Sequence, residues 1–106
     1  MKIMIGWTTL ASAEEAKDLA SRLVGERLAA CVQVQGPIVS FYRWQGVEES
    51  AEEYRLAVKF PQHLASSLKE WLLREHPYDN PQWLAVEVDD ISADYFQWIM
   101  DESGKI

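Results

Sequence analysis

The sequence predicts an α+β fold of the ferredoxin-like βαββαβ type, with a long central β-hairpin and an extra C-terminal helix. The apolar patterns follow the order strand, helix, strand, strand, helix, strand, and one more helix comes last. The two middle strands adjoin directly, and both exceed the usual strand length of about five or six residues. A chain of 106 residues without a Gly/Ser/Pro-rich linker has the size of one domain, 1–106.

The first strand and helix are predicted from a short apolar run and a capping pattern. Residues 2–8 place Ile3, Ile5 and Trp7 on one face. Ser12 and Glu15 have the spacing of a capping box, in which each satisfies a free amide of the other, so a helix begins there. Its apolar stripe is predicted to pack on the sheet and consists of Ala16, Leu19, Ala20, Leu23 and Val24.

The middle of the chain predicts the hairpin. Strand-like alternation runs over 29–44, with a bulge or bend expected at Gly36-Pro37. Gln45-Gly46 is the predicted turn, and strict alternation over 54–60 predicts the returning strand. Such a hairpin extends beyond the shorter strands and exposes backbone edges and aromatic side chains. We therefore expect it to pair with neighbouring subunits.

The last third of the chain predicts a helix, a strand and a second, shorter helix. Pro61 is expected to begin the helix, whose apolar face carries Leu64, Leu68, Trp71 and Leu72. The segment His76-Pro77-Tyr78-Asp79-Asn80-Pro81 must end it, because proline lacks the amide donor and restricts the residue before it. A strand is predicted over 83–88, and Ser92 is expected to cap the final helix.

Charge and cysteine content exclude several classes of function. With 10 basic and 17 acidic residues the net charge is −7 and the isoelectric point is near 4.7, so we expect no nucleic acid and no membrane as partner. Acidic pairs such as Glu52-Glu53 are read as solvated faces. Cys31 is the only cysteine, which excludes an intrachain disulfide and fits a reducing, cytoplasmic location. No apolar run approaches the ~20 residues of a membrane span.

Candidate metal ligands are His76, Glu75 and Cys31. The His76 imidazole suits copper, with the Glu75 carboxylate as a helper, although a histidine in the last turn of a helix also interacts favourably with the helix dipole. Cys31 is in phase with Gln33 and Gln35, so it should face away from the helices. There it is either a soft ligand for Cu(I) or a small packed apolar residue.

A second set of candidates belongs to a cleft. Trp44 and Tyr78 are either walls of a ligand pocket or anchors of assembly. Lys59 alternates onto the face opposite Leu56 and is expected to pair with Glu87 or to bind an anion. Because a Gly-rich phosphate loop, a G-x-S-x-G elbow and an H-E-x-x-H pair are all missing from the sequence, we predict no enzyme and no organic cofactor.

Four segments together resemble the CutA family of divalent-cation tolerance proteins. Residues 25–32 resemble its ERLAACV segment, residues 42–46 its Y-x-W-x-G hairpin tip, and residues 94–98 its D-Y-x-x-W helix. Residues 76–81 match its HPYxxP motif. The four segments come in the family's order and cover nearly the whole chain.

The resemblance implies a cytoplasmic homotrimer with hairpins paired between subunits, similar in architecture to PII-type signalling proteins. It also implies association with copper or other divalent cations. In some bacterial members a cysteine late in the first strand and two consecutive histidines bind copper; here Trp7 and Glu75 occupy two of those places and His76 the third. The expected function is a metal-responsive or signalling module. The alternatives are a PII-like regulatory scaffold that binds a small anion in the intersubunit cleft near Trp44, Lys59, His76 and Tyr78, or a structural assembly protein without ligand.

Overall fold

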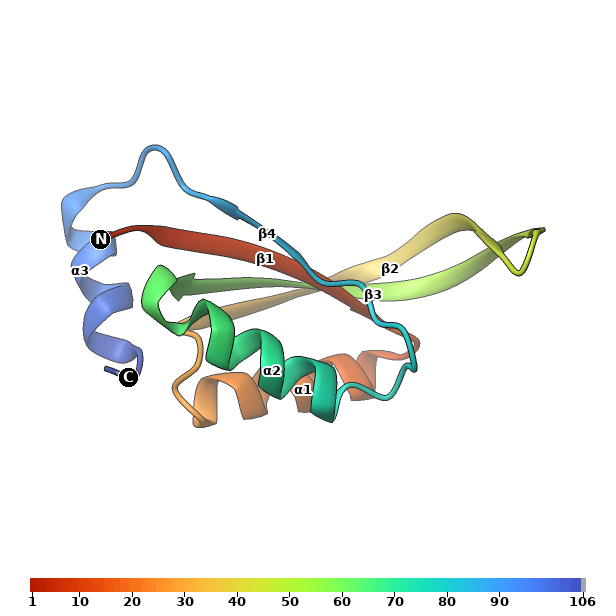
Figure 1. The fold of residues 1–106 in the computed structure, drawn as a ribbon, viewed down its shortest axis with the longest axis horizontal. Coiled ribbons are helices and arrows are strands. Elements are labelled where there is room, and N and C mark those ends of the chain that lie inside the picture. The colour runs from red at the N-terminus through yellow and green to blue at the C-terminus, as the bar shows by residue number, and fades with distance from the viewer. Residues whose placement is uncertain (106) are drawn as a thin grey trace.

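The computed structural model describes residues 1–105 and confirms the ferredoxin-like α+β fold (Figure 1). Four strands form one sheet in the order β2-β3-β1-β4, and each neighbouring pair is antiparallel. The elements are β1 (Ile3–Leu10), α1 (Ala13–Gly25), β2 (Cys31–Trp44), β3 (Val47–Pro61), α2 (Ala65–Glu75), β4 (Leu84–Glu87) and α3 (Ala93–Glu102), with a 3-10 turn over Gln62–Leu64.

One face of the sheet carries the main core, because α1 and α2 lie side by side across it (Figure 1). Alternation in the strands sends every second side chain toward these helices. The fully buried side chains from sheet and helices include Leu10, Leu56, Val58, Phe60, Leu19, Leu23, Leu68 and Leu72. Val24 does not join them, since 43% of it is exposed at the end of α1; its predicted place in the stripe was wrong.

The other face of the sheet is covered at one end only, by α3 (Figure 1). There Ile99 of α3 packs with Ile3 and Ala30 in a second small core. Further along this face Leu84 and Val86 of β4 are about half exposed, at 52% and 48%. We call this side of the sheet the open face.

The long hairpin is the part that projects from the body of the molecule (Figure 1). The last pair between β1 and β3 joins Leu10 to Tyr54, so residues 38–53 of β2 and β3 have only each other as sheet neighbours. The register is irregular between Gln35 and Ile38, where the Gly36-Pro37 bond is cis, in agreement with the predicted bend. At the tip, Gln45 and Gly46 have φ of 50° and 79°, as a two-residue hairpin turn requires.

Some predicted boundaries and contacts differ in detail. Pro61 is the last residue of β3 and precedes the 3-10 turn, so α2 begins four residues later. At Ser12, the Glu15 amide donates to the hydroxyl at 3.1 Å, but the return contact joins the hydroxyl and the Glu15 carboxylate at 3.3 Å. Half of the predicted capping box is therefore present. None of the helices within residues 1–105 is long and apolar enough to cross a membrane.

Candidate functional site

His76 occupies the C-terminal cap of α2 and is only 7% exposed. The amide of Tyr78 donates to its Nδ1 at 3.1 Å, which leaves the ring proton on Nε2. Nε2 then donates to the carbonyl oxygen of Thr9 at 3.0 Å. Burial lowers the pKa of His76, and this outweighs the opposing effects of the Thr9 hydrogen bond and of the nearby carboxylates Glu15 and Glu53. The imidazole is therefore neutral and both its nitrogens are engaged.

Tyr78 continues this set of contacts toward the hairpin. Its ring lies 4.8 Å from the His76 ring, tilted by 58°. Its hydroxyl donates to a carboxylate oxygen of Glu53 at 3.1 Å. Burial, followed by the contact with Glu53, raises the pKa of Tyr78 to about 12, so the hydroxyl keeps its proton at neutral pH. Tyr78 thus holds β3 at the residue just beyond its last pair with β1.

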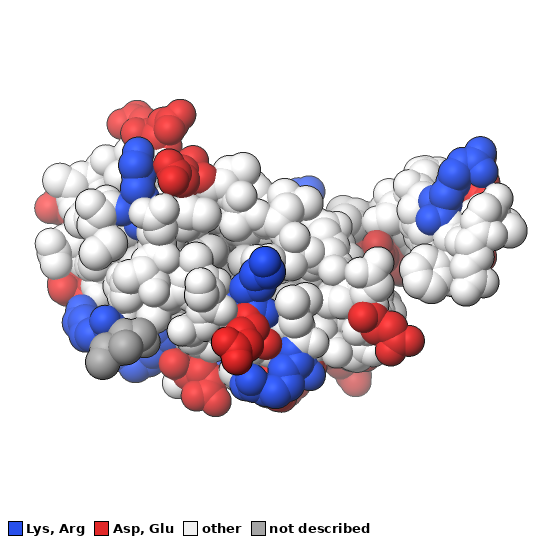
Figure 2. Space-filling view, viewed as in Figure 1, with Lys and Arg blue, Asp and Glu red and all other residues white. Residues whose placement is uncertain are grey.

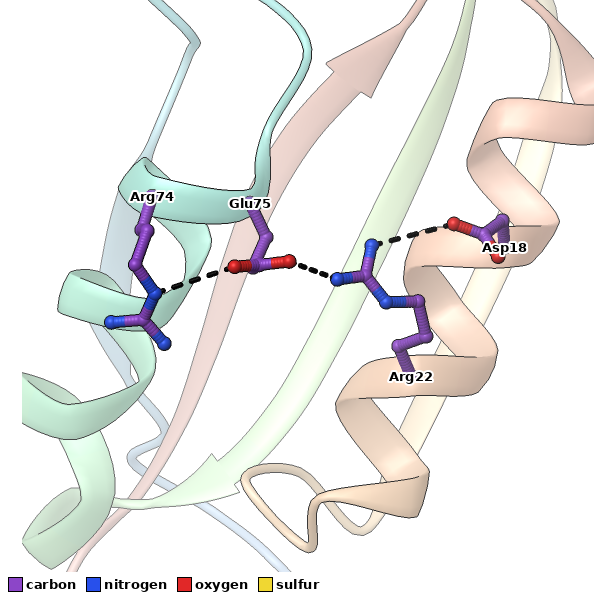
Figure 3. Close-up of polar contacts among 4 residues, drawn as sticks. All are labelled: Asp18, Arg22, Arg74 and Glu75. Atoms are coloured by element: carbon purple, nitrogen blue, oxygen red, sulfur yellow. Dashed lines mark hydrogen bonds and ion pairs between the residues drawn. The ribbon is translucent and has the colours of Figure 1, made fainter.

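Glu75 lies between the two long helices and binds arginines from both (Figure 3). One oxygen accepts from Arg22 of α1, and the other lies 3.3 Å from Nε of Arg74. The hydrogen bond from Arg22 is the main reason that the pKa of Glu75 is lowered. Arg22 also contacts Asp18 at 3.4 Å, and its guanidinium lies 5.1 Å from the ring of Trp71. Glu75 therefore joins α1 to α2.

Cys31 and Lys59 are paired across β2 and β3 on the open face, which confirms the predicted direction of both side chains. The Cys31 thiol is free and partly exposed. Lys59 donates to the Tyr95 hydroxyl at 3.2 Å, and its ammonium lies 5.4 Å from the Tyr95 ring. The expected pair between Lys59 and Glu87 was wrong: Glu87 lies 3.8 Å from Lys2 instead. Lys59 and Tyr95 line a cavity of about 260 Å³ between the sheet and α3.

Within one subunit the predicted metal ligands do not form a metal site. Cys31 faces the open face, whereas Glu75 joins the helices on the opposite side and His76 uses both nitrogens in hydrogen bonds. Across residues 1–105 no group of three or more His, Cys, Asp or Glu side chains could hold a metal ion. The donor set of a single subunit therefore does not fit a tightly bound cation.

The predicted cleft residues are also spread along the molecule. Trp44 lies at the tip of the hairpin, where it pairs with Val47, while Tyr78 contacts its root. Lys59 pairs with Ile5 in β1, and His76 binds Thr9, four residues further along that strand or about 13 Å away. One subunit does not bring Trp44, Lys59, His76 and Tyr78 into one cleft.

Sequence reasoning missed Glu53 as the partner of Tyr78 and Arg22 as the partner of Glu75. Glu53 belongs to an acidic stretch that was read as a solvated face, and Arg22 to the outer side of the first helix. Glu53 is 25 residues from Tyr78 in the sequence, and Arg22 is 53 residues from Glu75. The only feature of the sequence that pointed to these contacts was the charge of Glu53 and Arg22. A carboxylate or a guanidinium attracts polar groups of any segment that folds against it, so charge alone does not identify the partner.

The fold and these contacts define a small ferredoxin-like protein with an overhanging hairpin held at its root by the segment after α2. A family model and solved structures of known proteins match this chain over nearly its whole length. The family model described as CutA1 divalent ion tolerance protein matches residues 4–102, and the chain belongs to this family.

Relatives and solved structures agree with this assignment. The divalent-cation tolerance protein CutA of Thermus thermophilus is 38% identical over 91% of this chain and 93% of its own. The CutA of Pyrococcus horikoshii is 34% identical over 97% of this chain and 100% of its own. The crystal structure of CutA1 from Oryza sativa superposes with a TM-score of 0.96 at 27% identity, covering 100% of this chain and 97% of that one.

Proposed function

We propose that the protein serves divalent-cation tolerance as a homotrimeric, non-enzymatic module in the cytoplasm, assembled through its long hairpins and responsive to copper or another divalent cation. Family membership supports the cation-linked role. The free state of the single cysteine supports a reducing compartment. Trimeric stoichiometry is the state that the family resemblance implies.

The exposed hairpin is the observation that carries the proposed assembly. Phe41 is 77% exposed and Trp44 is 50% exposed, although both are large apolar side chains. The surface of the projecting hairpin is mostly uncharged in the view of Figure 2. Exposed aromatic side chains on an unpaired β-edge are unfavourable in water, and a second copy of the chain relieves both costs at once.

The double substitution Phe41→Ser and Trp44→Ser is expected to dissociate the assembly while leaving the subunit folded. Two aromatic anchors per hairpin would be lost, and such anchors carry much of the binding energy of an interface. We expect the dissociation constant to rise at least about 100-fold. Sedimentation equilibrium at micromolar concentration measures the change, and far-ultraviolet circular dichroism checks the fold.

Leu73→Ser is the matched control. Leu73 is also exposed, at 47%, but lies on α2 rather than on the hairpin, so its loss should leave the sedimentation profile unchanged. Wild-type protein that sediments as a 12.2 kDa monomer would contradict the proposal. A stable oligomer of another size would retain hairpin assembly and exclude the trimer.

We further propose that the assembly, rather than one subunit, binds the cation. A site with three protein donors must draw on more than one subunit, because within residues 1–105 of one subunit no such group converges. Cys31 lies on the open face and carries a free thiol, while His76 and Glu75 lie near the hairpin root. These three residues are the proposed ligands; to bind the cation, His76 must release its hydrogen bond to the Tyr78 amide or to Thr9, and Glu75 must release an arginine.

Calorimetric titration of Cu(II) in a buffer that does not chelate copper tests this proposal. We expect saturable binding by the wild-type assembly and none by the Phe41→Ser and Trp44→Ser variant, since dissociated subunits lack a complete donor set. Cys31→Ser, Glu75→Gln and His76→Gln then identify the ligand, with glutamine chosen to keep side-chain volume and hydrogen-bonding groups. Equal binding by the assembled and dissociated proteins would refute a shared site.

A further inference from the structure

We propose that Tyr78, supported by His76, sets the direction in which the hairpin leaves the sheet and thereby positions the surface that binds a second copy of this chain. The relevant contacts connect Thr9, His76, Tyr78 and Glu53, and we call them the His76–Tyr78 bridge. The inference about assembly rests on the proposed function; the inference about the hairpin itself does not.

The bridge is continuous from the end of β1 to the root of the hairpin. The Thr9 carbonyl accepts from Nε2 of His76 at 3.0 Å, and Nδ1 of His76 accepts from the Tyr78 amide at 3.1 Å. The Tyr78 hydroxyl donates to Glu53 at 3.1 Å. Two of these hydrogen bonds link the segment at the end of α2 to β1 and β3, and the third joins His76 to Tyr78 within the segment.

The place where the bridge meets the hairpin explains its effect. Tyr54 is the last β3 residue that pairs with β1, and Glu53 is the next residue toward the tip. Glu53 also pairs with Ile38, the first β2 residue after the irregular register. Sheet support thus ends at Tyr54, and the bridge supplies a contact at the next residue.

Within residues 1–105, the root of the hairpin has no second side-chain hydrogen bond to the body of the molecule. Among the described residues, side-chain hydrogen bonds that join residues 38–53 to the body of the molecule come only from Tyr78. Gly36 allows the Tyr54 ring to pack closely on the bend, since a Cβ there would lie 2.5 Å from that ring. One packed bend and one hydroxyl therefore act on the hairpin at the point where it leaves the sheet.

Tyr78→Phe removes only the hydroxyl and keeps the ring against His76. We expect backbone amides within 38–53 to exchange with solvent deuterium at least about tenfold faster, and the dissociation constant of the assembly to rise by a similar factor, from the loss of one hydrogen bond to a charged group. Amides that pair β1 with β3 should keep their wild-type exchange rates, because the sheet itself is not touched.

Substitutions of the acceptor Glu53 show whether the effect comes from the hydrogen bond with Tyr78 or from the negative charge of Glu53. Glu53→Ala should match Tyr78→Phe, and the double variant should be no worse than either single one, since all three remove the same bond. Glu53→Gln keeps an acceptor oxygen and should behave nearly as wild type. Tyr54→Phe is the matched control on the same strand, since no hydrogen bond of its hydroxyl is found among residues 1–105.

Two results would overturn the inference: wild-type exchange of the hairpin in Tyr78→Phe, or additive effects of the two single variants. If the wild-type protein proves monomeric, the proposed function fails, but exchange of residues 38–53 still decides whether the bridge holds the hairpin. If the protein assembles and exchange rises without any change in assembly, the bridge supports the hairpin but does not position the contact surface.

Discussion

His76→Ala is expected to lower the free energy of unfolding by about 3 kcal/mol, an effect comparable to a large core truncation. The substitution removes two hydrogen bonds and leaves the Thr9 carbonyl and the Tyr78 amide without their partner. Thr9 is only 6% exposed, so water reaches its carbonyl poorly. A buried polar group without a partner costs about 1–3 kcal/mol. Urea denaturation of wild type and variant measures the difference.

His63→Ala is the matched control for this prediction. Within residues 1–105, His63 makes one hydrogen bond, with Nε2 at 2.8 Å from the carbonyl oxygen of Gly104, and it is less buried than His76. We expect it to cost only about 1 kcal/mol. Equal losses from the two histidines would show that the His76–Tyr78 bridge adds no particular stability.

The pH dependence of stability should carry the signature of His76. Its pKa in the folded protein lies below the ordinary value of about 6.5, because burial favours the neutral ring. The unfolded chain therefore binds protons more readily as the pH falls through 6.5. The contribution of His76 is complete above about pH 6.5 and decreases below it, down to the folded pKa. The His76→Ala variant should lose this part of the acid slope, and an unchanged slope would exclude His76 as its source.

Gly6→Ala is the second large effect, with an expected loss of about 2 kcal/mol. A Cβ at Gly6 would lie 2.2 Å from one atom of the Trp83 indole and 2.8 Å from two others. Trp83 packs against the main core and lies 6.0 Å from the Phe60 ring, so the whole ring must move. Overpacking costs about 1–3 kcal/mol, whereas the entropy gain of alanine over glycine is about 0.4–1 kcal/mol. The clash therefore determines the sign.

Trp83→Leu provides the test of mechanism for Gly6→Ala. A smaller side chain at 83 makes room for the new methyl group, so Gly6→Ala should cost much less in the Trp83→Leu background than in wild type. Thermal denaturation of the four proteins in this cycle measures the coupling. Additive losses would place the cause elsewhere, for example in the pairing of Gly6 with Ala85 of β4.

Much of the fold could be predicted from local pattern. Side chains alternate between two faces along a strand and share a face at spacings of three and four along a helix. These periods follow from the geometry of the backbone, so they can be read from the sequence. The break at Gly36-Pro37, the turn at Gln45-Gly46 and the helix end before Pro77 follow from backbone restrictions of glycine and proline. These restrictions are local, so the structure confirms them.

The contacts of the predicted site depended on distances that the sequence does not contain. His76, Glu75 and Cys31 were grouped by their chemistry, but the fold sends them to different places: His76 to β1, Glu75 to Arg22 of α1 and Cys31 to the open face. The same folding brought Glu53 to Tyr78 across 25 residues.

The sequence by itself determined the order of elements, the long hairpin and the direction of Cys31 and Lys59, because strand and helix periodicity act between near neighbours. Only the tertiary structure decided which polar groups of the motif remained free. A buried imidazole or a partly buried carboxylate takes the partners that packing brings within about 3 Å, since leaving it unpaired costs more than any local preference. For that reason His76 and Tyr78 support the root of the hairpin through Thr9 and Glu53, two partners that no local sequence pattern predicts.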